Sequence, residues 1–126
     1  MQRSDRGGHM LDALLSARPK LKVFRGRDTL HYFRLYDYNG EVLLTSQGVP
    51  EESQCVTNLD LAKTAVNDEK NFGRQTTSDS KFTYLLMSPS RQVLAVGAMY
   101  NNVRDCDDAI RTLKHAMAEA QRDDSA

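Results

Sequence analysis

Hydrophobic and polar residues alternate in several short segments of the chain. Residues 30–38 alternate with a period of two, which is typical of a half-buried strand, and residues 41–47 are predicted as the return strand of a hairpin. A second hairpin is predicted from residues 81–87 and 92–99. Each pair follows a shorter strand-like run, at 21–25 and at 71–77. The pattern therefore predicts six strands in two sets of three.

Two longer segments, 52–66 and 103–119, have apolar residues at helical spacing. Asn102 is a favourable N-cap, and Asp105 follows at the distance where its side chain can complete the cap. The apolar positions of the first segment are Cys55, Leu59, Ala62 and Val66. Those of the second are Val103, Cys106, Ala109, Ile110, Leu113, Ala116 and Met117. Each set of strands is thus followed by a predicted amphipathic helix.

The two halves of this pattern are copies of each other. A shift of 51 positions superposes Leu35 on Leu86 and Cys55 on Cys106, without a gap. Such agreement across strands and helix predicts a duplicated unit within one domain. The predicted boundaries are a flexible tail over 1–19 with a short amphipathic helix over 10–17, one domain over 20–120 made of repeats 20–69 and 70–120, and a polar tail over 121–126.

The turns of the two predicted hairpins differ in sequence. Asn39-Gly40 favours a two-residue type I′ turn, which needs positive φ at both positions. Such a turn pairs Leu35 with Leu44 and Tyr36 with Leu43. The second hairpin has Ser88-Pro-Ser-Arg91 in this place, so a looser connection is predicted there.

The motif Tyr32-Phe-Arg-Leu, followed by Asn39-Gly-Glu-Val-Leu-Leu-Thr-Ser46 and an amphipathic helix, resembles the YegP-like family. The doubling with a Phe72-led strand between the copies resembles it too. This is a bacterial family of small domains of unknown function, built as tandem β-β-β-α-β units. The resemblance covers about 20–118, and the chain departs from the pattern at Ser90-Arg91, Arg104 and Val49.

The resemblance implies an α+β fold. It implies an antiparallel sheet of about six strands, with two helices on one face and two pseudo-symmetric repeats. The strand after each helix is expected to join the other half. No catalytic residue is carried over from the family.

Composition limits the function classes. Of 126 residues, 40% are hydrophobic and 27% charged, as in an ordinary globular protein. No apolar run approaches the roughly 20 residues of a membrane helix, and no signal-peptide core is visible, so a cytoplasmic protein is expected. The zero formal charge hides an excess of basic residues in 1–36 and of acidic residues in 37–126. That asymmetry either steers an anionic partner or is simply solvated.

No catalytic or metal-binding constellation is visible. The histidines lack partners at metal-ligand spacing, and no Cys-x-x-Cys occurs. Cys55 and Cys106 lie on the apolar stripes, which favours core packing over redox chemistry. We therefore predict no enzyme, cofactor or metal. The leading prediction is a non-catalytic binding or protein-interaction module, and the alternative is a nucleic-acid-binding protein.

The alternative depends on a predicted interaction face. Tyr32, Arg34, Tyr36 and Tyr38 should share the sheet face turned away from the helices. Aromatic residues interleaved with cations can stack bases and hold phosphates, but ordinary cross-strand pairing also explains them. Further basic residues lie nearby in sequence, at Lys20, Lys22, Arg25 and Arg27.

The same face should be apolar in the second repeat. There the predicted contact patch is Leu85, Met87, Leu94 and Val96. Exposed apolar patches of this kind mark contacts. Either the amphipathic segment 10–17 covers the patch or two chains meet there in an isologous dimer.

Overall fold

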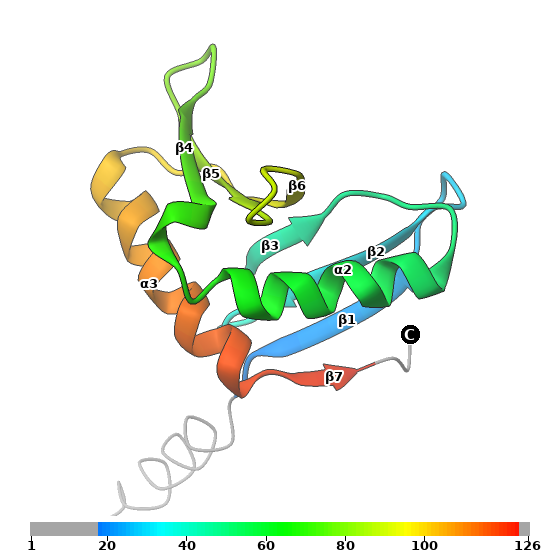
Figure 1. The fold of residues 1–126 in the computed structure, drawn as a ribbon. Helices are drawn as coiled ribbons and strands as arrows, with labels where there is room; N and C mark the ends of the chain where they lie inside the picture. Colours follow the sequence, from blue (N-terminus) through cyan, green and yellow to red (C-terminus); the bar gives the residue numbers. More distant parts are fainter. Residues whose placement is uncertain (1–17, 124–126) are drawn as a thin grey trace, which may run out of the picture.

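A computed structural model describes residues 18–123 (Figure 1), so the helix predicted over 10–17 lies outside the described residues. Two helices, one short 3₁₀ helix and seven strands make up this part of the chain. They are β1 (Lys20–Arg25), β2 (His31–Tyr36), β3 (Val42–Ser46), α2 (Glu52–Ala65), η1 (Glu69–Asn71), β4 (Phe72–Thr76), β5 (Phe82–Met87), β6 (Val93–Gly97), α3 (Val103–Glu119) and β7 (Gln121–Asp123).

One sheet holds all seven strands, in the order β4-β5-β6-β3-β2-β1-β7. The first six strands pair with one another in antiparallel fashion, and α2 and α3 pack on one face (Figure 1), which confirms the predicted α+β fold. The strands that follow the helices are exchanged, since β4 pairs with β5 while β7 pairs with β1. The sequence analysis missed β7, a parallel edge strand where it predicted a polar tail.

The two hairpin turns have the same geometry, contrary to the sequence-based prediction. Gly40 N–H donates to the Asp37 carbonyl at 3.0 Å, and Arg91 N–H donates to Ser88 at 2.8 Å. Gly40 has φ 82° and Arg91 has φ 71°, whereas Asn39 does not have positive φ. Each connection is therefore a type I turn closed by one left-handed residue, and neither is type I′.

A β-bulge in each repeat changes the predicted pairing. Leu35 pairs with Leu44 as expected, but Tyr36 pairs with Val42 instead of Leu43. The same shift pairs Met87 with Val93. The bulge follows from the three-residue turn, which places one more residue in the returning strand than a two-residue turn would.

Both long helices begin at capped residues. Glu51 and Gln54 form a reciprocal capping box at the start of α2. At α3 the Asn102 side chain accepts the Asp105 N–H at 2.8 Å, as predicted. The helix bounds agree with the predicted segments to within one residue.

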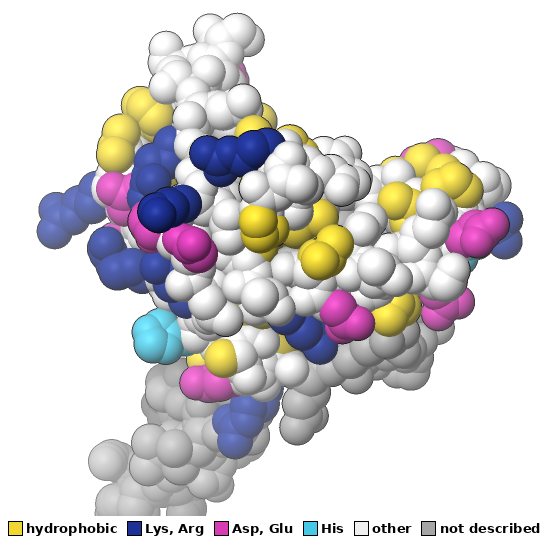
Figure 2. All heavy atoms as spheres, in the orientation of Figure 1, with side chains coloured by type: hydrophobic (Ala, Val, Ile, Leu, Met, Phe, Trp, Pro, Cys, Tyr) yellow, Lys and Arg dark blue, Asp and Glu magenta, His cyan; other side chains and the backbone are white. Residues whose placement is uncertain are grey.

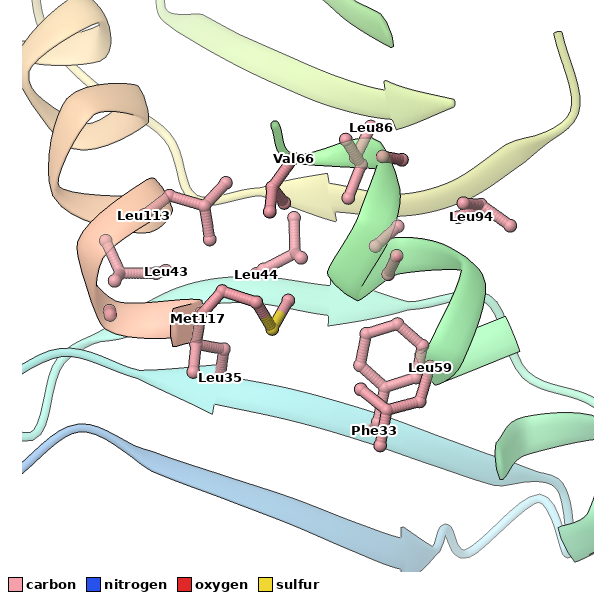
Figure 3. Close-up of a cluster of buried hydrophobic side chains, with 14 of the residues drawn as sticks. Phe33, Leu35, Leu43, Leu44, Leu59, Val66, Leu86, Leu94, Leu113 and Met117 are labelled. Carbon is pink, nitrogen blue, oxygen red and sulfur yellow. The ribbon is translucent and has the colours of Figure 1, made fainter. Parts of the chain in front are cut away.

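The hydrophobic core lies between the helices and the sheet. Leu43 and Leu113 point toward each other in Figure 3, as do Phe33 and Leu59. All four side chains are at most 4% exposed. Burial of such side chains is the main source of stability in a domain of this size. None of the described helices is long and apolar enough to cross a membrane.

An ion-pair network joins η1, β4 and α3 on the surface. Arg74 Nε lies 2.8 Å from Asp107, and Arg74 Nη2 lies 3.1 Å from Glu69. Lys114 Nζ also contacts Glu69, at 3.0 Å. Figure 2 shows basic and acidic side chains gathered over this part of the molecule. The network connects segments that are distant in sequence.

Candidate interaction face

The sheet has one face that neither α2 nor α3 covers, which we call the open face. A single row of paired residues crosses it from strand to strand. The row runs Lys22, Arg34, Thr45, Val96 and Leu85, from β1 through β2, β3 and β6 to β5. All five residues are partly exposed. The predicted basic face and the predicted apolar patch are therefore two halves of one surface.

The basic half of the open face is a layer of rings and cations. The Phe24 and Tyr32 rings stack with centroids 5.6 Å apart. The Arg34 guanidinium lies 4.9 Å from the Phe24 centroid, and Lys22 Nζ lies 5.8 Å from that of Tyr36. These cation–π contacts hold the charged side chains flat against the sheet. Phe24 belongs to this layer, although the sequence analysis did not single it out; its alternation with Leu21 and Val23 was the available signal.

Hydrogen bonds fix the rim of the basic half. The Tyr32 hydroxyl donates to the Asp28 carboxylate in the β1–β2 turn. This bond raises the pKa of Tyr32 and lowers the pKa of Asp28, because it favours the neutral phenol and the charged carboxylate. Arg34 Nε donates to Thr45 Oγ1 at 3.3 Å. The layer is thus pre-ordered before any partner binds.

Tyr38 does not join the other three predicted residues. It lies in the β2–β3 turn, and its hydroxyl donates to Glu119 at the end of α3, at 2.7 Å. The hydrogen bond raises the pKa of Tyr38. Because β2 ends at Tyr36, the two-residue period that placed Tyr38 on the open face stops before it. The structure brings together Tyr32, Arg34 and Tyr36 only.

The apolar half of the open face contains Leu85, Met87 and Val96 as predicted, but not Leu94. Leu94 is 1% exposed and lies in the core under α2 (Figure 3). The bulge in β6 puts Val93 opposite Met87 in its place. Val93 is partly exposed, so the apolar half is Leu85, Met87, Val93 and Val96. Residues Val93 to Ala95 are all apolar, so a two-residue alternation could not indicate the bulge.

The two thiols lie away from the open face. Cys55 and Cys106 are 1% and 2% exposed in the core, at equivalent places in α2 and α3. Burial raises the pKa of the Cys106 thiol, which disfavours the reactive thiolate. Among residues 18–123, no cluster of His, Cys, Asp or Glu could hold a metal ion.

Comparison with known proteins places this fold. No family model matches the chain. A UPF0339 protein from the ptx operon 5′ region of Stutzerimonas stutzeri is 26% identical over 89 residues, which cover 71% of this chain and 80% of that protein. A UPF0339 protein of Pseudomonas aeruginosa is 21% identical over 107 residues, covering 85% of this chain and 97% of that protein.

Two solved structures match with nearly complete coverage. The solution structure of E. coli YegP, a protein of unknown function, has a TM-score of 0.80 at 19% identity and covers 86% of this chain and 93% of that one. The fold of this chain is similar to that of YegP. A UPF0339 protein of Shewanella oneidensis gives a TM-score of 0.75 at 18% identity, with 82% of this chain and 90% of that one covered. For this YegP-like chain, the two structures show the fold alone.

Proposed function

We propose that this YegP-like protein is a non-catalytic interaction module that binds another protein through the open face. The observation that carries the proposal is the row from Lys22 to Leu85, which sets cations beside apolar side chains on a sheet surface that no described element covers. Apolar surface supplies most of the free energy of protein association, and flanking charges select the partner.

The chemistry of the partner follows from the two halves of the face. An apolar centre would pack on Leu85 and Val96, while carboxylates would face Lys22 and Arg34. The pre-ordered rings lower the entropy that binding must overcome. A second copy of the chain or the segment 1–17 could also cover the apolar half, and both can be tested with the same variants.

The test compares affinity capture by three baits. Leu85→Gln with Val96→Thr removes apolar surface from the open face and keeps its shape. Leu61→Gln is the matched control, because Leu61 is 41% exposed on α2 and far from that face. A protein retained by the wild type and by Leu61→Gln, but not by the double variant, supports the proposal. Equal capture by all three baits contradicts it.

The two alternative occupants of the apolar half, segment 1–17 and a second copy of the chain, predict different experimental results. If segment 1–17 covers the face, deleting it should increase capture or lower the melting temperature, and the double variant should remove that difference. If two copies meet there, sedimentation should show a dimer in the wild type and a monomer in the double variant.

Nucleic acid is the second candidate partner, favoured by Lys22 and Arg34 among three aromatic rings. Bases could stack on the rings while phosphates contact the cations. Electrophoretic mobility of single-stranded RNA at low and high salt tests it, since phosphate contacts weaken as salt rises. Lys22→Gln with Arg34→Gln should abolish a shift that Leu85→Gln leaves intact.

A further inference from the structure

The two repeats differ at one place where strands β3 and β6 meet. At one end of this pair, Gln47 N–H donates to the Leu94 carbonyl at 3.2 Å. The shift of 51 positions predicts a matching bond from Ala98 to Leu43 at the other end. There the Tyr84 hydroxyl donates to the Leu43 carbonyl in its place. Phe33, the counterpart of Tyr84, has no hydroxyl. The backbone bond between β3 and β6 is therefore present at one end of the pair and replaced by a side-chain bond at the other, which we call the split.

The Tyr84 ring fits into the split because Gly97 has no side chain. A Cβ on Gly97 would lie 2.5 Å from the ring, which is shorter than any allowed contact. The counterpart of Gly97 in the first repeat is Ser46, whose hydroxyl accepts the Phe33 N–H at 2.8 Å. The opening is therefore built by a matched pair, a tyrosine and a glycine.

A groove of about 510 Å³ lies between this split and α3. We call the apolar part of its lining, which includes Leu43 and Ala98, the floor; Met99 also lines the groove and is 63% exposed. Its described lining holds four carboxylates and no basic side chain. The carboxylates are Asp37, Glu41, Asp105 and Asp108.

The charge belongs to the open end only. The shift of 51 positions places Ser88, Gln92, Gln54 and Thr57 at the equivalent positions of the closed end, and none of these is charged. The Asp105 carboxylate accepts the side-chain N–H of the α3 cap residue Asn102, and the Asp37 carboxylate accepts the N–H groups of Asn39 and Glu41 in the turn. Glu41 and Asp108 take no part in the turn or the cap, but Asp108 forms an ion pair with Arg111 on α3. The carboxylates are thus specific to this end of the sheet, and Arg111 offsets the charge of one of them.

We propose that this groove binds a basic peptide segment of a partner protein, with Lys or Arg side chains at the carboxylates and apolar side chains on the floor. Charge complementarity favours this occupant, because the lining combines four carboxylates with apolar side chains and Arg111 offsets the charge of Asp108 alone. The described carboxylates form no cluster that could hold a metal ion, which favours an organic cation over a small inorganic one. The proposal does not depend on the open face.

The test uses full-length protein and a fluorescein-labelled octapeptide of alternating Arg and Leu. Glu41→Gln with Asp108→Asn removes two carboxylates that neither the turn nor the helix cap needs. Glu52→Gln with Asp60→Asn on α2 is the control, because it makes the same change in net charge outside the groove. Fluorescence anisotropy should show binding that the groove variant weakens roughly tenfold or more, that the control leaves within about twofold, and that salt weakens.

Backbone NMR locates the peptide. Its addition should shift the amides of Leu43, Met99 and Thr112, and a peptide with Glu in place of Arg should shift none of them. Equal affinity of the groove and control variants, or shifts confined to the open face, would overturn the proposal. A dimer that dissociates only in the groove variant would assign the groove to a second copy instead. Tighter peptide binding after deletion of residues 1–17 would assign it to that segment.

Discussion

Backbone strain at the residue scale is concentrated in the turns. Thr29, Ser80 and Arg91 have φ angles of 67°, 64° and 71°, and each closes the same kind of turn that Gly40 closes at 82°. A Cβ in the left-handed region costs roughly 1–2 kcal/mol, and a β-branched side chain tolerates it least. The fold therefore dictates the turn geometry even where the sequence opposes it.

Thr29→Gly should stabilise the protein. Glycine removes the Cβ strain and loses part of that gain to the greater freedom of the unfolded chain, so the expected net gain is about 0.5–1 kcal/mol. Urea unfolding measures the free energy. Thr29→Ala is the control, because alanine keeps the Cβ and should gain little. A gain of equal size with alanine would show that the strain does not come from φ.

At the element scale, the sequence predicts most of the fold, because periodicity and caps are local signals. The helices and six strands follow from periods of 3.6 and two residues. The bulges do not, since Val42 to Leu44 and Val93 to Ala95 are apolar without interruption. The strand β7 was missed because Gln121–Asp123 is polar, and its pairing with β1 is a tertiary contact.

The candidate site was predicted in outline for the same reason. Alternation placed Tyr32, Arg34 and Tyr36 correctly on one face, because all three lie within β2. It failed for Tyr38, beyond the end of that strand, and for Leu94, which lies after the bulge. The split between β3 and β6 could not be predicted, because it depends on a contact between Tyr84 and Leu43 that spans 41 residues.

The split also makes a prediction about pairing. In Tyr84→Phe the second repeat acquires the ring that Phe33 supplies in the first, and the Leu43 carbonyl loses its donor. We expect β3 and β6 to close by one more bond, from Ala98 N–H to Leu43. Hydrogen exchange should then show new protection of the Ala98 amide, and Tyr36→Phe on the open face should not. Unchanged exchange with a loss of about 1–3 kcal/mol would mean that the carbonyl stays unpaired.

At the scale of the whole molecule, Glu69 connects the middle of the chain to the first strand and the helix of the second repeat, β4 and α3. Glu69 precedes β4 in the chain. Its carboxylate lies 3.0 Å from Lys114 Nζ on α3 and 3.1 Å from Arg74 Nη2 on β4. Hydrogen bonds from Lys114, which has the larger effect, and from Arg74 hold the pKa of Glu69 below its ordinary value. Because the folded protein binds this proton less readily than the unfolded chain, Glu69 stabilises the fold near neutral pH. That contribution is lost as the pH falls through the folded-state pKa.

Glu69→Gln should therefore lower the melting temperature at pH 7 and make little difference at pH 3. The loss should correspond to less than about 1 kcal/mol, since the side chains are exposed and salt screens them. Calorimetry between pH 7 and pH 3 measures the difference from wild type, with Asp60→Asn on α2 as an exposed carboxylate outside the network. If the difference in melting temperature between wild type and Glu69→Gln stays constant down to pH 3, Glu69 acts by packing. Protonation removes the charge of Glu69 but leaves its packing contacts unchanged.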